Sequence, residues 1–184
     1  MSDGAGGREG ADEFELRHLQ ENDSFNSLRT GDERFAPLKM FARKNAKRYE
    51  AESLARTYVI VDVGQRRIAA YITLVCSEIS AEDLVRADGL HFPYPTYPAV
   101  KIARLLVDER YRDRRFGFGR KLVNLAQGIA TDEIAPSAGC RFVVVDSKAE
   151  AIEFYERCGF TLLDTPANRS RPEAILYLDL HKTV

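Results

Sequence analysis

The sequence has few cysteines and few histidines, and neither type is grouped as a metal site requires. No CxxC pair occurs, which argues against a zinc ribbon or a thioredoxin-like dithiol. No two histidines stand four residues apart, which argues against HExxH-type metal chemistry. We therefore expect no metal, and the scattered thiols suit a reduced, cytoplasmic compartment. The residues concerned are Cys76, Cys140, Cys158, His18, His91 and His181.

A charge excess and a long apolar run are also missing. The chain has 27 Lys and Arg against 28 Asp and Glu, which gives a formal net charge of -1. This balance argues against a protein whose whole surface binds nucleic acid or anionic lipid, but it leaves room for a local basic site. No apolar run approaches the ~18 residues that span a bilayer, so we expect no membrane partner.

Residues 1–11 are polar and rich in glycine, without the apolar segment of a signal peptide. We expect a disordered N-terminal lead there. The remaining residues, 12–184, are enough for a single domain with its own hydrophobic core.

Apolar and β-branched runs predict strands, and apolar residues at helical spacing predict helices. Strands are expected over residues 14–19, 57–63, 67–75, 99–107, 142–145, 160–163 and 174–180. Helices are expected over residues 24–54, from 118 to the breakers Pro136 and Gly139, and over 151–158, with an irregular connector over 80–98. This order predicts an α/β (α+β) domain built on a mixed sheet.

A possible ligand site lies between the strand that ends at Val107 and the helix that begins near Phe118. Gly117 and Gly119 allow backbone N–H groups to approach an anion closely. A helix N-terminus adds unsatisfied donors and a partial positive charge, so the segment predicts a pyrophosphate site. GxxxxGK[ST] is absent, and Leu122 replaces the third glycine of GxGxxG. The alternative is a glycine-containing turn with a solvated basic rim.

Two motifs resemble those of a known family. Residues 114–119, RRFGFG, fit the [Q/R]xxGx[G/A] signature of the GNAT N-acetyltransferase superfamily, and residues 153–160, EFYERCGF, resemble its late FYxxxGF signature. Residues 103–108 resemble its fourth strand, and the resemblance is clear over about residues 99–163. It implies a GNAT-like, V-splayed mixed sheet of about seven strands flanked by helices, with acetyl-CoA as co-substrate.

The resemblance also implies where acetyl-CoA binds. Its pantetheine arm would pair with the backbone of Leu105, Leu106 and Val107. Its pyrophosphate would lie on the loop and helix start formed by Arg112, Arg114, Arg115, Phe116, Gly117, Phe118, Gly119 and Arg120. The loop is longer than usual in the family, and Arg115 stands where a glycine is common. Lys148 replaces a frequent asparagine, and it would either reach the phosphates or face solvent.

Tyr155 is the candidate catalytic residue, because the family commonly has a tyrosine at this position of the FYxxxGF motif. A phenol close to the thioester sulfur can protonate the departing thiolate. The alternative is packing against Phe154 and Cys158, which is compatible with that role. Cys158 is expected to be a buried, inert thiol. Without a nucleophile in a suitable context, we expect direct transfer rather than an acyl-enzyme.

The general base is less clear from the sequence. A carboxylate can take the proton of the acceptor amine directly or through water, and Glu78 and Asp146 follow predicted strands. A solvated or ion-paired surface role is the alternative for each. Arg104 interrupts an apolar strand, where it would either line the acceptor pocket or pair with a carboxylate.

The acceptor is expected to be a primary amine of a small molecule, amino acid or peptide. An alternative comes from residues 41–45, 56–59 and 71–74, which loosely resemble GNAT toxins that acetylate aminoacyl-tRNA. In that case Arg43, Lys44, Lys47 and Arg48 would hold the nucleic acid. A CoA-binding module without turnover is a further alternative. The sequence leaves a homodimer open.

Overall fold

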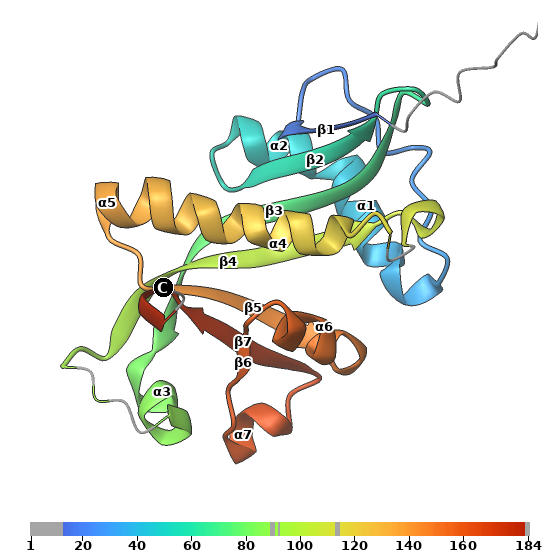
Figure 1. The fold of residues 1–184 in the computed structure, drawn as a ribbon. Helices are drawn as coiled ribbons and strands as arrows, with labels where there is room; N and C mark the ends of the chain where they lie inside the picture. The colour runs from blue at the N-terminus through green and yellow to red at the C-terminus, as the bar shows by residue number, and fades with distance from the viewer. Residues whose placement is uncertain (1–12, 89–90, 92, 113–114, 183–184) are drawn as a thin grey trace, which may run out of the picture.

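The computed structural model describes residues 13–88, 91, 93–112 and 115–182 (Figure 1). The expected lead over residues 1–11 lies outside this range, and the division into a lead and one domain over 12–184 stays a prediction. The strands are β1 (Phe14–His18), β2 (Arg56–Asp62), β3 (Arg67–Ser80), β4 (Thr96–Val107), β5 (Phe142–Lys148), β6 (Thr161–Leu162) and β7 (Glu173–Asp179). The α-helices are α1 (Ala36–Lys44), α2 (Ala46–Ala51), α3 (Ala81–Asp88), α4 (Phe118–Gly128), α5 (Ala135–Ala138), α6 (Ile152–Arg157) and α7 (Pro166–Arg169). Short 3-10 segments are η1 (Glu33–Phe35), η2 (Glu109–Tyr111), η4 (Ala149–Ala151) and η5 (Leu180–Lys182), and η3 (Ile129–Ile134) is a π-helix.

The strands form one seven-stranded sheet in the order β1-β2-β3-β4-β5-β7-β6. The central pair β4–β5 is parallel, and the other neighbouring strands are antiparallel. Parallel neighbours need a crossover, and the helix α4 supplies it between β4 and β5. The mixed α/β sheet of about seven strands is confirmed.

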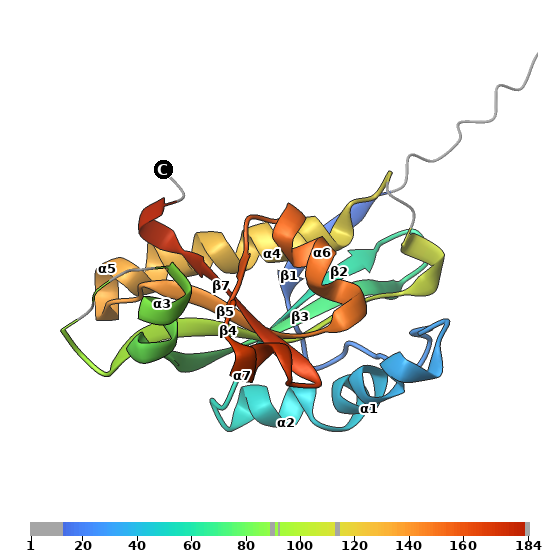
Figure 2. The ribbon, with the colours of Figure 1, turned by 90° about the horizontal axis from the view of Figure 1, so that it is seen from below.

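Helices cover both faces of the sheet. Figure 2 shows α4 and α6 on one face and α1 and α2 on the other. Leu122 and Val123 of α4 are fully buried against the β5 residues Val143 and Val145. On the opposite face, α1 and α2 pack over the β3 residue Tyr71 and its neighbours. No helix within the described residues is long and apolar enough to cross a membrane.

Residues 24–54 do not form the single helix that the sequence predicted. Helical structure begins only at Glu33, and Asn45 separates α1 from α2. Gly31 has a φ of +68°, which a right-handed helix cannot include. Asp32 then caps η1 by accepting a hydrogen bond from the N–H of Arg34. Pro37 lies in the first turn of α1, as expected.

Two other boundaries differ from the sequence prediction. The expected connector over residues 80–98 contains α3, and β4 already begins at Thr96. The helix after Gly117 continues beyond Pro136 through η3 and α5 and ends at Gly139, where φ is +78°. Pro136 is tolerated because it stands in the first turn of α5, after the π-helical turn of η3.

Candidate active site

The strands β4 and β5 stay paired for only part of their length. Their register pairs residues 99–102 with residues 142–145, and no further pair follows. Beyond this point, Leu105, Leu106 and Val107 still pair with β3 on one side. On the other side they form a strand edge without a described neighbour, which agrees with the predicted V-shaped splay. The carbonyl of Val107 accepts a hydrogen bond from Arg112 Nε at 3.0 Å, so part of this edge is already used.

A β-bulge in β4 decides which side chains enter the splay. Thr73 of β3 pairs with Arg104, whereas the next residue, Leu74, pairs with Ile102. Ala103 is therefore an extra residue in β4 without a partner in β3. After such a residue, the side chains of β4 point to the opposite faces of the sheet from those that regular alternation would give. Ile102 packs with α4, but the guanidinium of Arg104 lies 5.2 Å from the ring centroid of Phe41 in α1.

A cavity of about 540 Å³ lies between α1 and the diverging strands. One wall is mostly apolar and comes from η1 and α1, with Phe35, Pro37, Leu38, Met40 and Phe41. The opposite wall comes from Ile102, Ala103, Arg104 and Leu105 of β4 and from Val145, Asp146, Ser147 and Lys148 of β5. The remaining lining residues are Arg34, Asn45, Tyr49, Glu150, Ala151, Tyr155 and Glu173.

Tyr155 reaches this cavity from α6, on the other face of the sheet. Its side chain packs against Phe154 and Phe160, with ring centroids 5.0 and 5.6 Å away, and it is only 6% exposed. Burial raises the pKa of the Tyr155 phenol well above its ordinary value, so the phenol is protonated at neutral pH. Both sequence interpretations of Tyr155, core packing and proximity to the reaction, fit this position. Its catalytic role stays a prediction.

The first turn of α4 is suited to bind an anion. Gly117 precedes the helix with a φ of +60°, which glycine adopts without strain, and no side chain of the described residues caps the first N–H groups. A Cβ on Gly119 would come within 3.1 Å of the Phe154 ring. Glycine at this position therefore lets α4 approach α6 closely. These features fit the predicted pyrophosphate site.

The arginines near this turn already have contacts within the protein. Arg112 Nη2 donates to the carbonyl of Thr30 at 2.6 Å, and Arg120 Nη2 donates to the carbonyl of Arg157 at 2.5 Å. The guanidinium of Arg115 stacks 4.4 Å from the ring centroid of the adjacent phenylalanine. Arg114 lies outside the described residues. Phosphate binding by these arginines stays a prediction, and for Arg112 and Arg120 it would be added to a structural contact.

The phenylalanines of the same segment serve packing. Phe116 and Phe118 lie 5.5 and 4.8 Å from Phe14 of β1, measured between ring centroids, and Tyr111 completes the cluster. Phe118 is only 2% exposed. These two residues therefore offer a ligand mainly their backbone groups, while their side chains anchor the loop to the core.

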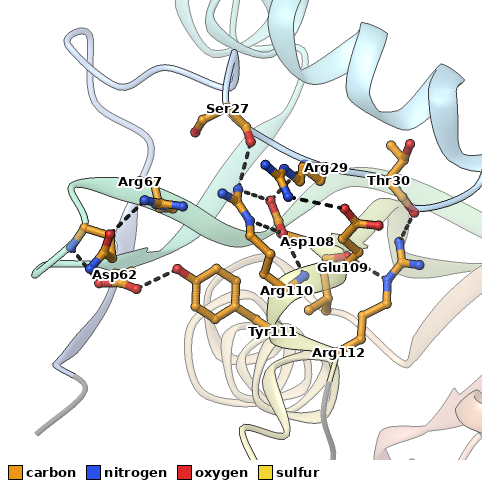
Figure 3. Close-up of polar contacts among 12 residues, drawn as sticks. Ser27, Arg29, Thr30, Asp62, Arg67, Asp108, Glu109, Arg110, Tyr111 and Arg112 are labelled. Carbon is orange, nitrogen blue, oxygen red and sulfur yellow. Dashed lines mark hydrogen bonds and ion pairs between the residues drawn. The ribbon is translucent and has the colours of Figure 1, made fainter.

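The sequence did not reveal the role of Asp108 (Figure 3). Its carboxylate is fully buried and accepts hydrogen bonds from Arg110 Nη2 at 2.6 Å and from the N–H of Arg29 at 2.8 Å. Burial alone would raise the pKa of Asp108, but these hydrogen bonds lower it below its ordinary value. Arg110 lies just before the arginines predicted to bind the pyrophosphate, but its guanidinium is bound to Asp108.

The remaining candidate residues differ in whether they line the cavity and in which groups they contact. Asp146 lines the cavity and pairs with Lys101 Nζ at 2.5 Å. Glu78 lies opposite Pro98, near the far end of β3, and does not line the cavity, so its proposed role as the base is not supported. Lys148 does line the cavity, but its ammonium donates to the carbonyl of Arg34 at 3.1 Å. Cys158 is buried, and burial raises the pKa of its thiol, as expected for an inert cysteine.

The arrangement is typical of group transfer, because an open strand edge and a helix start suited to an anion lie beside a separate cavity. Within the described residues, no group of three or more His, Cys, Asp or Glu side chains could hold a metal ion. A family model described as Acetyltransferase (GNAT) family matches residues 21–160. The chain belongs to the GNAT family and is an acetyltransferase with acetyl-CoA as its co-substrate. No curated protein matches the chain.

Several solved structures share the fold. A bacterial toxin is 18% identical, with a TM-score of 0.78, and the match covers 94% of this chain and 93% of the toxin. AtaT in complex with acetyl-methionyl-tRNAfMet is 19% identical, with a TM-score of 0.77, covering 92% of this chain and 96% of AtaT. The KacTA–DNA complex contains a chain that is 18% identical, with a TM-score of 0.66, covering 92% and 95%. At these identities the likeness concerns the fold.

Proposed function

We propose that the chain acetylates the α-amino group of an aminoacyl-tRNA. The observation that carries this proposal is a surface with an excess of basic side chains on the helices that border the cavity. A small amine or free amino acid, the acceptor that the sequence favoured, is the alternative. Both acceptors would receive the acetyl group from acetyl-CoA in the same site. The experiment must therefore compare how well each acceptor is acetylated.

The basic surface consists of five cations within residues 36–51: Lys39, Arg43, Lys44, Lys47 and Arg48. The same range holds one acidic residue, Glu50, and its carboxylate pairs with Arg56 and accepts the N–H of Thr57. We call these five cations the α1–α2 basic surface. Their excess positive charge stands out in a chain whose formal net charge is -1.

The described hydrogen-bond partners of this surface are neutral groups, and the Asp23 carboxylate, which also acts electrostatically on Lys47, is itself paired with Arg17. Arg43 Nε donates to Asn26 Oδ1 at 3.0 Å, and Lys47 Nζ donates to the carbonyl of Glu21 at 2.5 Å. Arg48 Nη2 donates to Asn45 Oδ1 at 3.2 Å. A neutral acceptor orients a cation but does not cancel its charge. The surface is therefore suited to a polyanion such as an RNA backbone.

The location of the surface links it to the chemistry. The helix α1 carries Arg43 and also forms the apolar wall of the cavity, so a nucleic acid bound there would present its end to the cavity. The likeness to AtaT, which is known in complex with acetyl-methionyl-tRNAfMet, supports the same class of acceptor. A free amino acid would need the cavity but not the five cations beside it.

The chain's own groups have separate tasks in the transfer. The first turn of α4 would hold the pyrophosphate, and the open edge of β4 at Leu105 and Leu106 would hold the pantetheine arm. Acetyl-CoA would supply the acetyl group: a C–N bond forms, the C–S bond breaks, and the proton that the amine loses goes to water. The protonated phenol of Tyr155 would donate its proton to the CoA thiolate and regain one from water.

Acetylation of aminoacyl-tRNA, of free amino acids and of simple amines should be compared with the same enzyme preparation. We expect aminoacyl-tRNA to have the highest kcat/KM, and we expect the triple variant Arg43→Glu, Lys44→Glu, Lys47→Glu to lose this advantage. Arg169→Glu is the matched control, because α7 lies far from α1 and α2 (Figure 1). Equal kcat/KM values for aminoacyl-tRNA and the free amino acid would favour the small-amine alternative.

A further inference from the structure

Most charged side chains of the cavity already have a partner in the protein. Arg34 pairs with Asp32 at 2.7 Å and with Glu150 at 3.3 Å. Asp146 pairs with Lys101, and the Lys148 ammonium is bound to a backbone carbonyl. Arg34 and Asp146 are therefore neutralised by ion pairs, and the Lys148 ammonium is held by a hydrogen bond, before any acceptor enters.

Arg104 differs from these residues. Arg104 lines the cavity and is exposed. Among the described residues, no carboxylate forms an ion pair with it. Its one described hydrogen bond runs from Nη1 to the carbonyl of the preceding residue, Ala103, at 2.5 Å. Lys148 and Glu173 also line the cavity without a described ion-pair partner, but the Lys148 ammonium is held by the carbonyl of Arg34, and Glu173 lies on β7, beyond β5.

The position of the Arg104 guanidinium is set by two independent features. The β-bulge at Ala103 moves it from the face covered by α4 to the face covered by α1. There it stacks over the Phe41 ring, 5.2 Å from the centroid, which orients the planar group. An oriented guanidinium with free N–H groups matches an oxyanion in a two-point geometry that lysine cannot provide.

We propose that Arg104 is the residue of the cavity that recognises an oxyanion of the acceptor. Two sources share this chemistry: a phosphate of the terminal nucleotide of an aminoacyl-RNA, or the carboxylate of a free amino acid. The first source rests on the proposed function, and the second does not. Arg104 thus selects the acceptor, whereas Tyr155 and the first turn of α4 serve the donor.

Two matched acceptor pairs separate these sources. The first pair is a 3′-O-aminoacyl adenosine with and without a 5′-phosphate, and the second is an amino acid and its amide. A two-point hydrogen bond to a charged group predicts that kcat/KM for the anionic member of one pair is about tenfold to a hundredfold higher. A preference in the first pair identifies a phosphate, and one in the second identifies a carboxylate.

Three variants assign the preference to Arg104. Arg104→Gln should abolish it by raising KM for the anionic acceptor, and Arg104→Lys should restore only part of it, because the fork is lost. Phe41→Leu should weaken it by removing the ring beneath the guanidinium. Arg169→Gln is the matched control, because this arginine lies on α7 and pairs with Asp164. Acetyl-CoA binding, measured by calorimetry, should be retained in Arg104→Gln, which shows that the protein is folded and the donor site intact.

The outcomes distinguish this proposal from the proposed function. If aminoacyl-RNA is not acetylated but Arg104→Gln removes the preference for the amino acid over its amide, the role of Arg104 stands and the aminoacyl-tRNA assignment fails. If aminoacyl-RNA is acetylated and Arg104→Gln leaves both ratios unchanged, the role of Arg104 is refuted. The absence of any anion preference in the unaltered protein refutes it as well.

Discussion

Gly119 lies so close to the ring of Phe154 that a Cβ added to the glycine would come within 3.1 Å of it. This contact joins α4, whose first turn is predicted to bind an anion, to α6, which carries Tyr155. Tyr155 follows Phe154 directly in α6. A substitution at Gly119 would therefore affect both the first turn of α4 and the position of Tyr155. The glycine therefore serves close packing of α4 on α6 as well as access to an anion.

We predict that Gly119→Ala destabilises the protein and weakens acetyl-CoA binding. The added methyl group collides with Phe154, and overpacking of this kind costs about 1–3 kcal/mol, partly offset by a helix-propensity gain of about 1 kcal/mol. Calorimetry would measure both the melting temperature and the acetyl-CoA affinity. Gly128→Ala is the matched control at the other end of α4, where the nearest atom to the new Cβ is 4.0 Å away. It should be stabilising, and equal effects at the two positions would contradict the packing argument.

Tyr155→Phe should lower kcat by about a hundredfold while leaving acetyl-CoA affinity unchanged, because it removes only the proton donor. The hydroxyl has no described hydrogen-bond partner in the protein, so the fold should tolerate the change. Since burial raises the pKa of the phenol, Tyr155 should cause no loss of kcat between neutral and mildly alkaline pH. Tyr177→Phe removes a hydroxyl that is buried and has no described partner, so it should leave kcat unaltered. An unchanged kcat in Tyr155→Phe would exclude the phenol as the acid.

Asp108→Asn should destabilise the protein by about 3 kcal/mol at neutral pH, because one partner of a buried ion pair is lost. The folded-state pKa of Asp108 is below its ordinary value of 3.8, so between these two pKa values the unfolded state binds more protons. Its stabilising contribution is therefore present above the unfolded pKa and is lost as the pH falls through the folded pKa. Urea unfolding at several pH values should show this loss in the unaltered protein and a smaller one in Asp108→Asn. Equal pH dependence in both proteins would rule out this coupling.

Binding of aminoacyl-tRNA should weaken steeply with salt. Each phosphate neutralised on single-stranded nucleic acid contributes about -0.7 to the slope of log K against log salt, and about -0.9 on a duplex. Charge reversal at Arg43 and Lys44 should make the measured slope shallower. Reversal of Arg169, outside the α1–α2 basic surface, should leave the slope as it is. A slope near zero in the unaltered protein would remove the basis for a polyanionic acceptor.

The donor side of the site could be predicted in part from the sequence. Gly117, Gly119 and Tyr155 belong to short motifs whose residues lie close together along the chain, so their neighbourhood is encoded locally. The structure places Gly117 directly before α4 and Tyr155 at the cavity, and their roles toward acetyl-CoA stay predictions. Arg112 and Arg120 could not be assigned in this way, because the carbonyls that they bind belong to Thr30 and Arg157.

The acceptor side was much less accessible to sequence reasoning. Phe41 was included in a loosely similar segment, and it does line the cavity, but nothing indicated that Arg34 and Met40 do so too. Glu78 and Asp146 looked equivalent, since each follows an apolar run. Only the sheet register shows that Asp146 lies at the splay of β4 and β5 and that Glu78 lies far along β3.

The sequence by itself determined the mixed α/β architecture and the strand, glycine turn and helix around Gly117. Alternation, helical periodicity and the conformational freedom of glycine act between residues close in the chain, so they are visible in one dimension. Only the tertiary structure decided which charges remain available for ligands. Arg110 is taken by the buried Asp108, and one extra residue at Ala103 turns Arg104 into the cavity. Both results depend on contacts between distant segments and on a register shift that moves side chains to the other face.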